Sequence, residues 1–235
     1  MKSRKVILFI VEGVSDKNSL ALILSRLLKN EKIEFHVIHG DITTRTDTTI
    51  QNCIKKVNTE IIKFLNTNRF KRSDILRIVH LVDTDGAYID DKLIKEHNTD
   101  KFIYTTENIL TSNISKAIDR NNRKSKILNK LWSVSSINKT EYRMYYFSCN
   151  LEHVLHNEQN LDHNLKDKYS DDFVEHYYGK EDKFLEFINN SEFSVKGNYN
   201  ETWNFIKQGK NSLNRYCNLN IYFKEYYDNE KEIIE

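Results

Sequence analysis

Three acidic residues stand where they could hold a metal ion for phosphoryl-transfer chemistry. Glu12 ends one apolar run of the sequence, Asp83 and Asp85 end another, and a glycine follows each motif. In an extended chain the side chains of Asp83 and Asp85 point to the same side, because successive side chains alternate. Two carboxylates that close repel each other unless a cation neutralises them, and Mg²⁺ prefers such hard oxygen ligands. The three residues therefore predict a site for Mg²⁺ or Mn²⁺, where the ion would polarise a phosphate and activate water.

The runs that precede these carboxylates are typical of buried strands. Residues 6–11 read V-I-L-F-I-V, and residues 78–82 read I-V-H-L-V. Such runs suit strands that are covered on both faces, as in a parallel sheet. Gly13 allows the backbone to turn sharply after the first strand, and Ser15 is expected to cap the helix that follows.

The order of the predicted elements favours an α/β fold. Strands are expected at 6–11, 33–39, 77–82 and 143–148, and amphipathic helices at 15–30 and 49–65. The order β-α-β-α-β indicates a parallel sheet with right-handed crossovers. Ligand sites of open α/β sheets lie beyond the carboxyl ends of the strands. We therefore expect Glu12, Asp83 and Asp85 to converge at that edge, within reach of one metal ion.

A fourth carboxylate follows the last predicted strand of this sheet. Residues 148–152 read S-C-N-L-E at the start of a predicted helix. Glu152 is expected to be an additional metal ligand. The alternative is that Glu152 only interacts favourably with the positive end of the helix, where acidic residues are common.

Basic residues are concentrated in a predicted helix at 111–132. Arg120, Arg123 and Lys124 fall on one face of it together with Lys116. This face is expected to contact the phosphates of a nucleic acid beside the acidic site, since net affinity for nucleic acid needs such a patch. The alternative is a solvated face of an exposed helix.

The C-terminal third mixes aromatic and charged residues. Helices are expected at 170–178, at 181–188 and around Trp203, a short strand at 102–104, and a frayed acidic tail from residue 228. Lys207 and Lys210 lie among aromatic residues and asparagines, a composition that could bind phosphate and stack on bases. With Lys17, they are candidates for a positive group near the charge that develops during hydrolysis.

The E-G motif after a first strand and the D-x-D-G motif after a later one resemble the Toprim domain. That resemblance covers about the first two thirds of the chain. It implies a doubly wound, mainly parallel four-stranded sheet flanked by helices. It also implies that Asp83 and Asp85 hold Mg²⁺ or Mn²⁺, while Glu12 acts as a general acid or base.

Small free-standing Toprim chains include ribosomal RNA maturation nucleases and phage-defence effectors. The D-T-D-G motif, the S-x-N-x-E motif and the aromatic helical tail resemble the second group, in particular the PARIS-system Toprim effector and its OLD-like, RloB-like and AbiL-like relatives. This resemblance implies a Mg-dependent endonuclease of an anti-phage abortive-infection system. It would cleave RNA (tRNA in the PARIS case) or DNA and be released or activated by an ABC-type ATPase partner.

Two alternatives stay open at this point. The first is a ribosomal RNA maturation nuclease, and the second is a catalytically silent Toprim-fold subunit that binds an ATPase or nucleic acid. The substrate, RNA or DNA, and a homodimeric state are also left open.

Length and composition limit the class of protein, its partners and its domain organisation. The chain has 235 residues with a net charge of +2, which neither requires nor excludes a nucleic-acid partner. No apolar run is long enough to span a membrane, and three widely spaced cysteines favour a reducing cytoplasm. We expect a Toprim domain at 1–158, with a basic helical insertion at about 106–132, and a helical C-terminal subdomain at 159–235.

Overall fold

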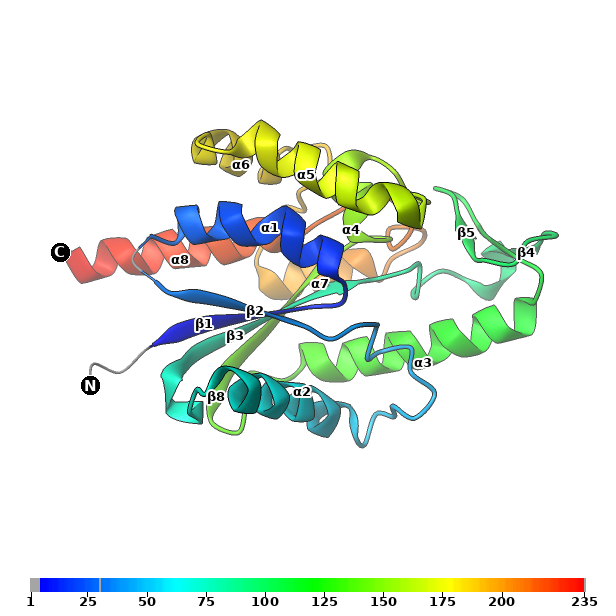
Figure 1. Cartoon of the computed structure of the whole chain (residues 1–235). Coiled ribbons are helices and arrows are strands. Elements are labelled where there is room, and N and C mark those ends of the chain that lie inside the picture. Colours follow the sequence, from blue (N-terminus) through cyan, green and yellow to red (C-terminus); the bar gives the residue numbers. More distant parts are fainter. Residues whose placement is uncertain (1–4, 30, 235) are drawn as a thin grey trace. The chain divides into compact units, whose positions relative to one another are not determined.

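The chain forms a mixed α/β structure (Figure 1). The computed structural model describes residues 5–29 and 31–234, and the side chains up to Asp228. The strands are β1 (Val6–Val11), β2 (Ile33–Val37), β3 (Ile75–Asp83), β4 (Ile94–Glu96), β5 (Ile103–Tyr104), β6 (Ile109–Thr111), β7 (Ser136–Ile137) and β8 (Thr140–Phe147). The α-helices are α1 (Val14–Leu27), α2 (Cys53–Asn68), α3 (Ile114–Trp132), α4 (Leu151–His156), α5 (Lys166–Tyr177), α6 (Glu181–Ile188), α7 (Tyr199–Ile206) and α8 (Leu219–Ile234).

The larger sheet has five strands in the order β2-β1-β3-β8-β7. Strand β1 pairs in parallel with both β2 and β3, whereas β7 and β8 pair antiparallel as a short edge hairpin. All six residues of β1 are buried, because a central strand of a parallel sheet is covered on both faces. The predicted mainly parallel sheet flanked by helices is confirmed, and β7 is a strand that the sequence did not predict.

The chain divides into two compact units, each of which draws residues from both sides of the predicted boundary at residue 158. The first unit comprises Met1–Val82, Asp119–Met144 and Asp162–Glu181, and the second comprises Asp83–Ile118, Tyr145–Leu161 and Asp182–Glu235.

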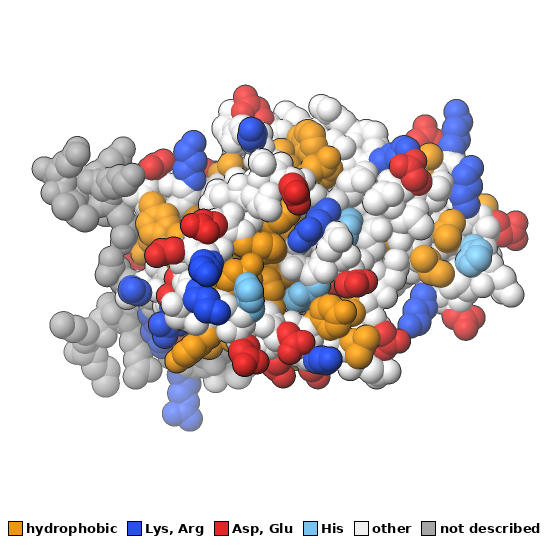
Figure 2. All heavy atoms as spheres, turned by 90° about the horizontal axis from the view of Figure 1, so that it is seen from above, with side chains coloured by type: hydrophobic (Ala, Val, Ile, Leu, Met, Phe, Trp, Pro, Cys, Tyr) orange, Lys and Arg blue, Asp and Glu red, His pale blue; other side chains and the backbone are white. Residues whose placement is uncertain are grey.

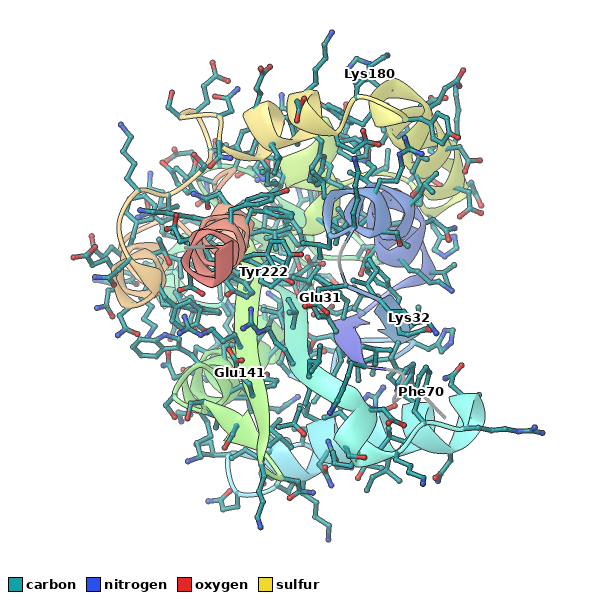
Figure 3. The ribbon with its side chains drawn as sticks, turned by 90° about the vertical axis from the view of Figure 1, so that its left-hand side faces the viewer. Glu31, Lys32, Phe70, Glu141, Lys180 and Tyr222 are labelled. Carbon is teal, nitrogen blue, oxygen red and sulfur yellow. The ribbon has the colours of Figure 1, made fainter. Side chains whose placement is uncertain are left out.

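In the first unit, helices lie on both faces of the sheet. Helix α1 lies on one face with α5 packed against it, and α2 and the C-terminal part of α3 lie on the other face (Figure 1). Phe9 of β1 stacks on Phe35 of β2 with 5.1 Å between ring centroids. Lys32 Nζ lies 5.1 Å from the ring centroid of Phe70, so the start of β2 meets the segment after α2 (Figure 3). The predicted amphipathic helices bury their apolar faces, since Leu20 and Leu24 of α1 and Val57 and Ile61 of α2 are all 0% exposed.

In the second unit, a small three-stranded sheet in the order β4-β6-β5 packs over its own apolar cluster, which includes Ile94, Ile109 and Leu213. The strand expected at 102–104 is present as β5. Gly86 adopts φ +66°, and a Cβ at this position would lie 2.6 Å from Leu213 Cδ2. The glycine after the D-x-D motif is therefore required by both conformation and space.

Two expectations about helix ends were wrong. The N-cap of α1 is Gly13 rather than Ser15, because the Asp16 side chain accepts a hydrogen bond of 2.8 Å from the Gly13 N–H. The tail expected to be frayed is instead part of α8, which continues to Ile234. Tyr222 and Tyr226 are buried four residues apart on this helix, so apolar packing stabilises it. Among the described residues, no helix combines the length and the apolar character needed to cross a membrane.

Candidate metal and nucleic-acid site

The D-T-D-G loop (residues 83–86) is hydrogen-bonded to the turn that carries Glu152. Asp83 Oδ1 accepts a hydrogen bond of 2.9 Å from the Leu151 N–H, and the Asp85 N–H donates to the Cys149 carbonyl at 2.7 Å. The two motifs are 68 residues apart in the sequence at the Asp83–Leu151 contact. The structure therefore brings together the D-x-D and S-x-N-x-E motifs that the sequence singled out separately.

A third segment, which the sequence analysis missed, completes this loop network. The Ser212 carbonyl accepts hydrogen bonds from the Gly86 N–H at 3.0 Å, the Thr84 hydroxyl at 2.9 Å and the Cys149 N–H at 3.0 Å. Thr84 is fully buried between the two aspartates. Ser212 lies in the turn between Lys210 and Leu213, and no local pattern distinguishes this turn from others.

Asp85 has a left-handed backbone conformation, with φ +48°. Among residues other than glycine, Asp and Asn tolerate this region best, because their short polar side chains can hydrogen-bond locally. The extended geometry assumed from the sequence therefore does not apply beyond Asp83, where β3 ends. The turn after the strand, rather than strand alternation, decides where the Asp85 carboxylate lies.

Glu152 is a buried residue in the first turn of α4, with 4% of its surface exposed. Asn150 caps this helix by accepting a hydrogen bond of 2.8 Å from the His153 N–H. Burial, with a smaller effect of the Arg215 charge, lowers the pKa of His153 to about 4, so this imidazole is neutral at pH 7. The S-x-N-x-E motif is thus a capped helix start that holds a carboxylate next to the D-T-D-G loop.

Glu12 lies directly after β1 in the first unit, where its carbonyl accepts a hydrogen bond of 3.0 Å from the Gly40 N–H. Its side chain is half-buried. Asp83, Asp85 and Glu152 belong to the second unit. The expected convergence of Glu12 with these residues stays a prediction.

Within the described part of the chain, no group of three His, Cys, Asp or Glu side chains is arranged to hold a metal ion. Mg²⁺ is commonly held by only one or two protein carboxylates, with waters and substrate phosphates as its other ligands. Asp83 and Asp85 offer two such carboxylates from one fixed loop. Their donor chemistry therefore fits Mg²⁺ or Mn²⁺ as a two-carboxylate site.

Lys124 was expected to contact phosphate, and this expectation was wrong. Its side chain is 0% exposed, and its Nζ donates a hydrogen bond of 2.7 Å to Asp41 Oδ2. Helical periodicity places Lys124 near Arg123 around the axis of α3, but it does not reveal which residues face the protein interior. Arg123 is half-buried and donates a hydrogen bond of 2.9 Å to the Thr44 carbonyl.

The other basic candidates are more accessible. Arg120 donates to Asn121 Oδ1 at 2.6 Å, and Lys210 forms an ion pair with Glu107. Lys207 is half-buried, and burial lowers its pKa. Lys17 is exposed on α1. Figure 2 shows lysines and arginines interspersed with acidic side chains on the face that it displays.

Like Ser212, Asp41 was not singled out from the sequence. Asp41 follows β2 and Gly40, whereas Asp85 follows β3 and precedes Gly86. An acidic residue just beyond a strand end was therefore a signal that the sequence contained.

The fold defines an α/β protein with a mostly parallel sheet flanked by helices. In comparisons with known proteins, no family model, no curated protein and no solved structure matches the chain.

Proposed function

We propose that the chain is a metal-dependent nuclease that hydrolyses phosphodiester bonds of RNA or DNA. The observation that supports this most directly is the hydrogen bond from the Leu151 N–H to Asp83 Oδ1, which fixes the D-T-D-G loop against the turn that carries Glu152. Asp83 and Asp85 would hold Mg²⁺ or Mn²⁺ as a two-carboxylate site. When bound, the ion would stabilise charge on the phosphate and supply an activated water.

The residues of this chain would have separate roles in that reaction. The bond to the Leu151 N–H holds the Asp83 carboxylate in one orientation, which lowers the entropy lost when a cation and a phosphate bind. The left-handed turn at Asp85 places a second carboxylate two residues further on. Glu12 would give or take a proton at the reacting oxygen, a role that rests on the Toprim resemblance.

The narrower proposal is a Toprim effector of an anti-phage system, acting on tRNA or DNA and controlled by an ABC-type ATPase partner. Its support is the order of the motifs together with the Asn150-capped turn that carries Glu152 beside the D-T-D-G loop. The substrate and the partner follow from the resemblance alone.

The test is cleavage of tRNA and of plasmid DNA by the wild type and by Asp83→Asn and Asp85→Asn, with Mg²⁺ or Mn²⁺. Asn at 83 can still accept the Leu151 hydrogen bond, and Asn at 85 tolerates the left-handed conformation, so both changes remove charge with little effect on the fold. We expect each variant to lose roughly 100-fold in rate, the scale of removing one group that stabilises developing charge.

Asp91→Asn is the matched control, because Asp91 is an exposed aspartate of the same unit. It should cleave like the wild type. Full activity in Asp85→Asn would refute the proposed site. Binding of nucleic acid by the wild type without cleavage would instead support the catalytically silent subunit.

A further inference from the structure

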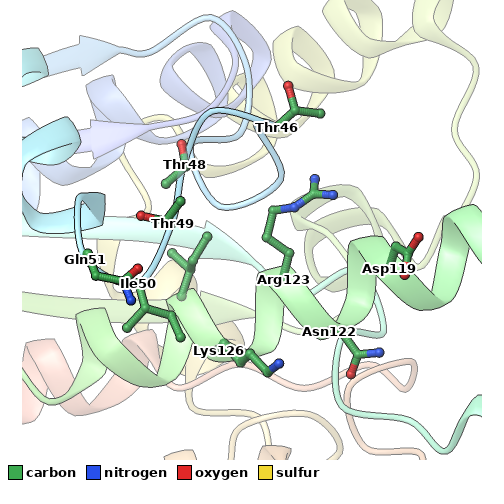
Figure 4. A pocket seen from close by; sticks show the side chains of 10 residues that line it. Thr46, Thr48, Thr49, Ile50, Gln51, Asp119, Asn122, Arg123 and Lys126 are labelled. Atoms are coloured by element: carbon green, nitrogen blue, oxygen red, sulfur yellow. The ribbon is translucent and has the colours of Figure 1, made fainter.

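A pocket in the first unit lies between the loop after β2 and helix α3, and it has a volume of about 430 Å³. We call this loop the threonine loop (residues 41–51). It leads into α2 and contributes three threonines to the lining of the pocket. Figure 4 shows Arg123 reaching from α3 toward the part of this loop that carries Thr46 and Thr48. The volume is within the range of about 300–1,000 Å³ that is usual for small-molecule sites.

The two walls of the pocket are tied together by buried contacts. The ion pair between Lys124 and Asp41 joins α3 to the start of the threonine loop, and Arg123 holds the Thr44 carbonyl at 2.9 Å. Asp41 Oδ1 also accepts a hydrogen bond of 2.6 Å from the Thr43 N–H. The pocket is therefore formed before any ligand binds, which reduces the entropy lost on binding.

The charges that line the pocket favour an anion. Arg123 and Lys126 contribute two positive charges, and Asp119 contributes one negative charge. Asp47, which lies in the same loop, forms an ion pair with Lys56, so it repels an anion less than an unpaired carboxylate would. The pocket also adjoins the N-terminus of the 16-residue helix α2, whose N-cap residue Asn52 makes no side-chain capping bond. The positive end of a helix adds to the attraction for an anion.

The pocket also has an apolar part. Ile50 is 41% exposed and Ile127 is fully buried, and both line the same pocket. An exposed isoleucine next to cations and hydroxyls suits a ligand with a flat apolar ring as well as an anionic group. A carboxylate such as Asp119 is a common partner for the hydroxyls of a ribose.

We propose that this pocket binds a nucleoside monophosphate. Its phosphate would contact Arg123 and Lys126, its ribose would contact Asp119, and its base would lie on Ile50. This site is formed by residues other than the carboxylates of the proposed nuclease, so the two proposals can fail separately.

The test is isothermal titration calorimetry of the full chain with AMP, ribose 5-phosphate and inorganic phosphate. We expect AMP to bind more tightly than ribose 5-phosphate, and ribose 5-phosphate more tightly than phosphate alone. Lys126→Gln should weaken binding about tenfold or more, as expected for a hydrogen bond to a charged group.

Two controls make the result decisive. Lys130→Gln removes an exposed lysine one turn along α3 that does not line the pocket, and it should bind AMP like the wild type. Asp85→Asn should also bind AMP normally, whether or not it cleaves nucleic acid. The proposal is overturned by absence of AMP binding at millimolar concentration, or by unchanged affinity in Lys126→Gln. Equal affinity for AMP and ribose 5-phosphate, or Lys126-dependent binding of a single-stranded RNA without AMP binding, would also overturn it.

Discussion

Lys124 Nζ donates a hydrogen bond of 2.7 Å to Asp41 Oδ2, although the Lys124 side chain is 0% exposed. Burial by itself would raise the pKa of Asp41. The charge of Lys124 and the hydrogen bonds from Lys124 and Thr43 outweigh burial and lower it. This buried ion pair joins α3 to the threonine loop.

Replacing Lys124 with methionine should destabilise the protein strongly. The change leaves the Asp41 carboxylate buried without its counter-ion, and breaking a buried pair in this way costs about 3–5 kcal/mol. The free energy of unfolding, measured by urea denaturation at pH 7, checks this. The double variant Asp41→Asn with Lys124→Met should lose less than the sum of the two single variants, because no unpaired charge is left behind. Substitutions at the surface usually change the free energy of unfolding by no more than about 0.5 kcal/mol. A decrease of less than about 1 kcal/mol in Lys124→Met would therefore contradict a buried ion pair.

His80 should make the protein less stable in mild acid. Burial lowers its pKa from 6.5 to about 4; the Asp41 charge opposes this shift and the Lys124 charge adds to it. Between those two pH values the unfolded chain binds a proton that the folded protein does not, so the free energy of unfolding falls as the pH is lowered. From pH 7 to pH 5 this group should remove about 2 kcal/mol.

Urea denaturation at pH 7 and pH 5 tests the role of His80 with the variant His80→Asn. Asn can still pair with the Tyr142 hydroxyl, which lies 2.8 Å from His80 Nδ1, and it does not titrate. The variant should lose less stability between the two pH values than the wild type. His163→Asn, which changes an exposed histidine, should keep the wild-type pH dependence.

Glu12→Gln should abolish cleavage of nucleic acid and leave the fold intact. The change keeps the shape of a half-buried side chain and removes its charge, so the thermal midpoint without metal should hold or rise slightly. A cleavage assay and a thermal melt on the same preparation check both parts. Unfolding of the variant would show that Glu12 has a structural role, and retained cleavage would remove it from the proposed mechanism.

Nucleic-acid binding should depend on Arg120 and Lys207 through salt-sensitive phosphate contacts. Each contact should contribute about 0.7–0.9 to the fall of log affinity with log salt. Arg120→Gln and Lys207→Gln should therefore each weaken binding and reduce that slope by about this amount. Fluorescence anisotropy of a labelled oligonucleotide from low to moderate salt measures it. Lys92→Gln removes an exposed lysine and should change neither quantity; equal slopes in all variants would show that Arg120 and Lys207 make no phosphate contact.

The sequence was sufficient to predict β1 and β3 and their parallel pairing. It also predicted that Glu12 follows β1 directly and that Asp83 lies at the end of β3. These features depend on local patterns, since a run of apolar residues must be buried on both faces and a polar residue after it ends the strand. The short strand β5 and helix α6 were also predicted, because their patterns are contained within a few residues.

Only the tertiary structure decided which polar residues are buried and which segments meet. Periodicity placed Lys124 on a basic face of α3, but its partner Asp41 is 83 residues away, and burial of the pair depends on how the loop after β2 meets that helix. In the same way, the Ser212 carbonyl joins the D-T-D-G loop to the turn before Glu152 through contacts that no local pattern contains. Local patterns determine strands and helices because those depend on neighbours in sequence, whereas ion pairs and loop networks depend on neighbours in space.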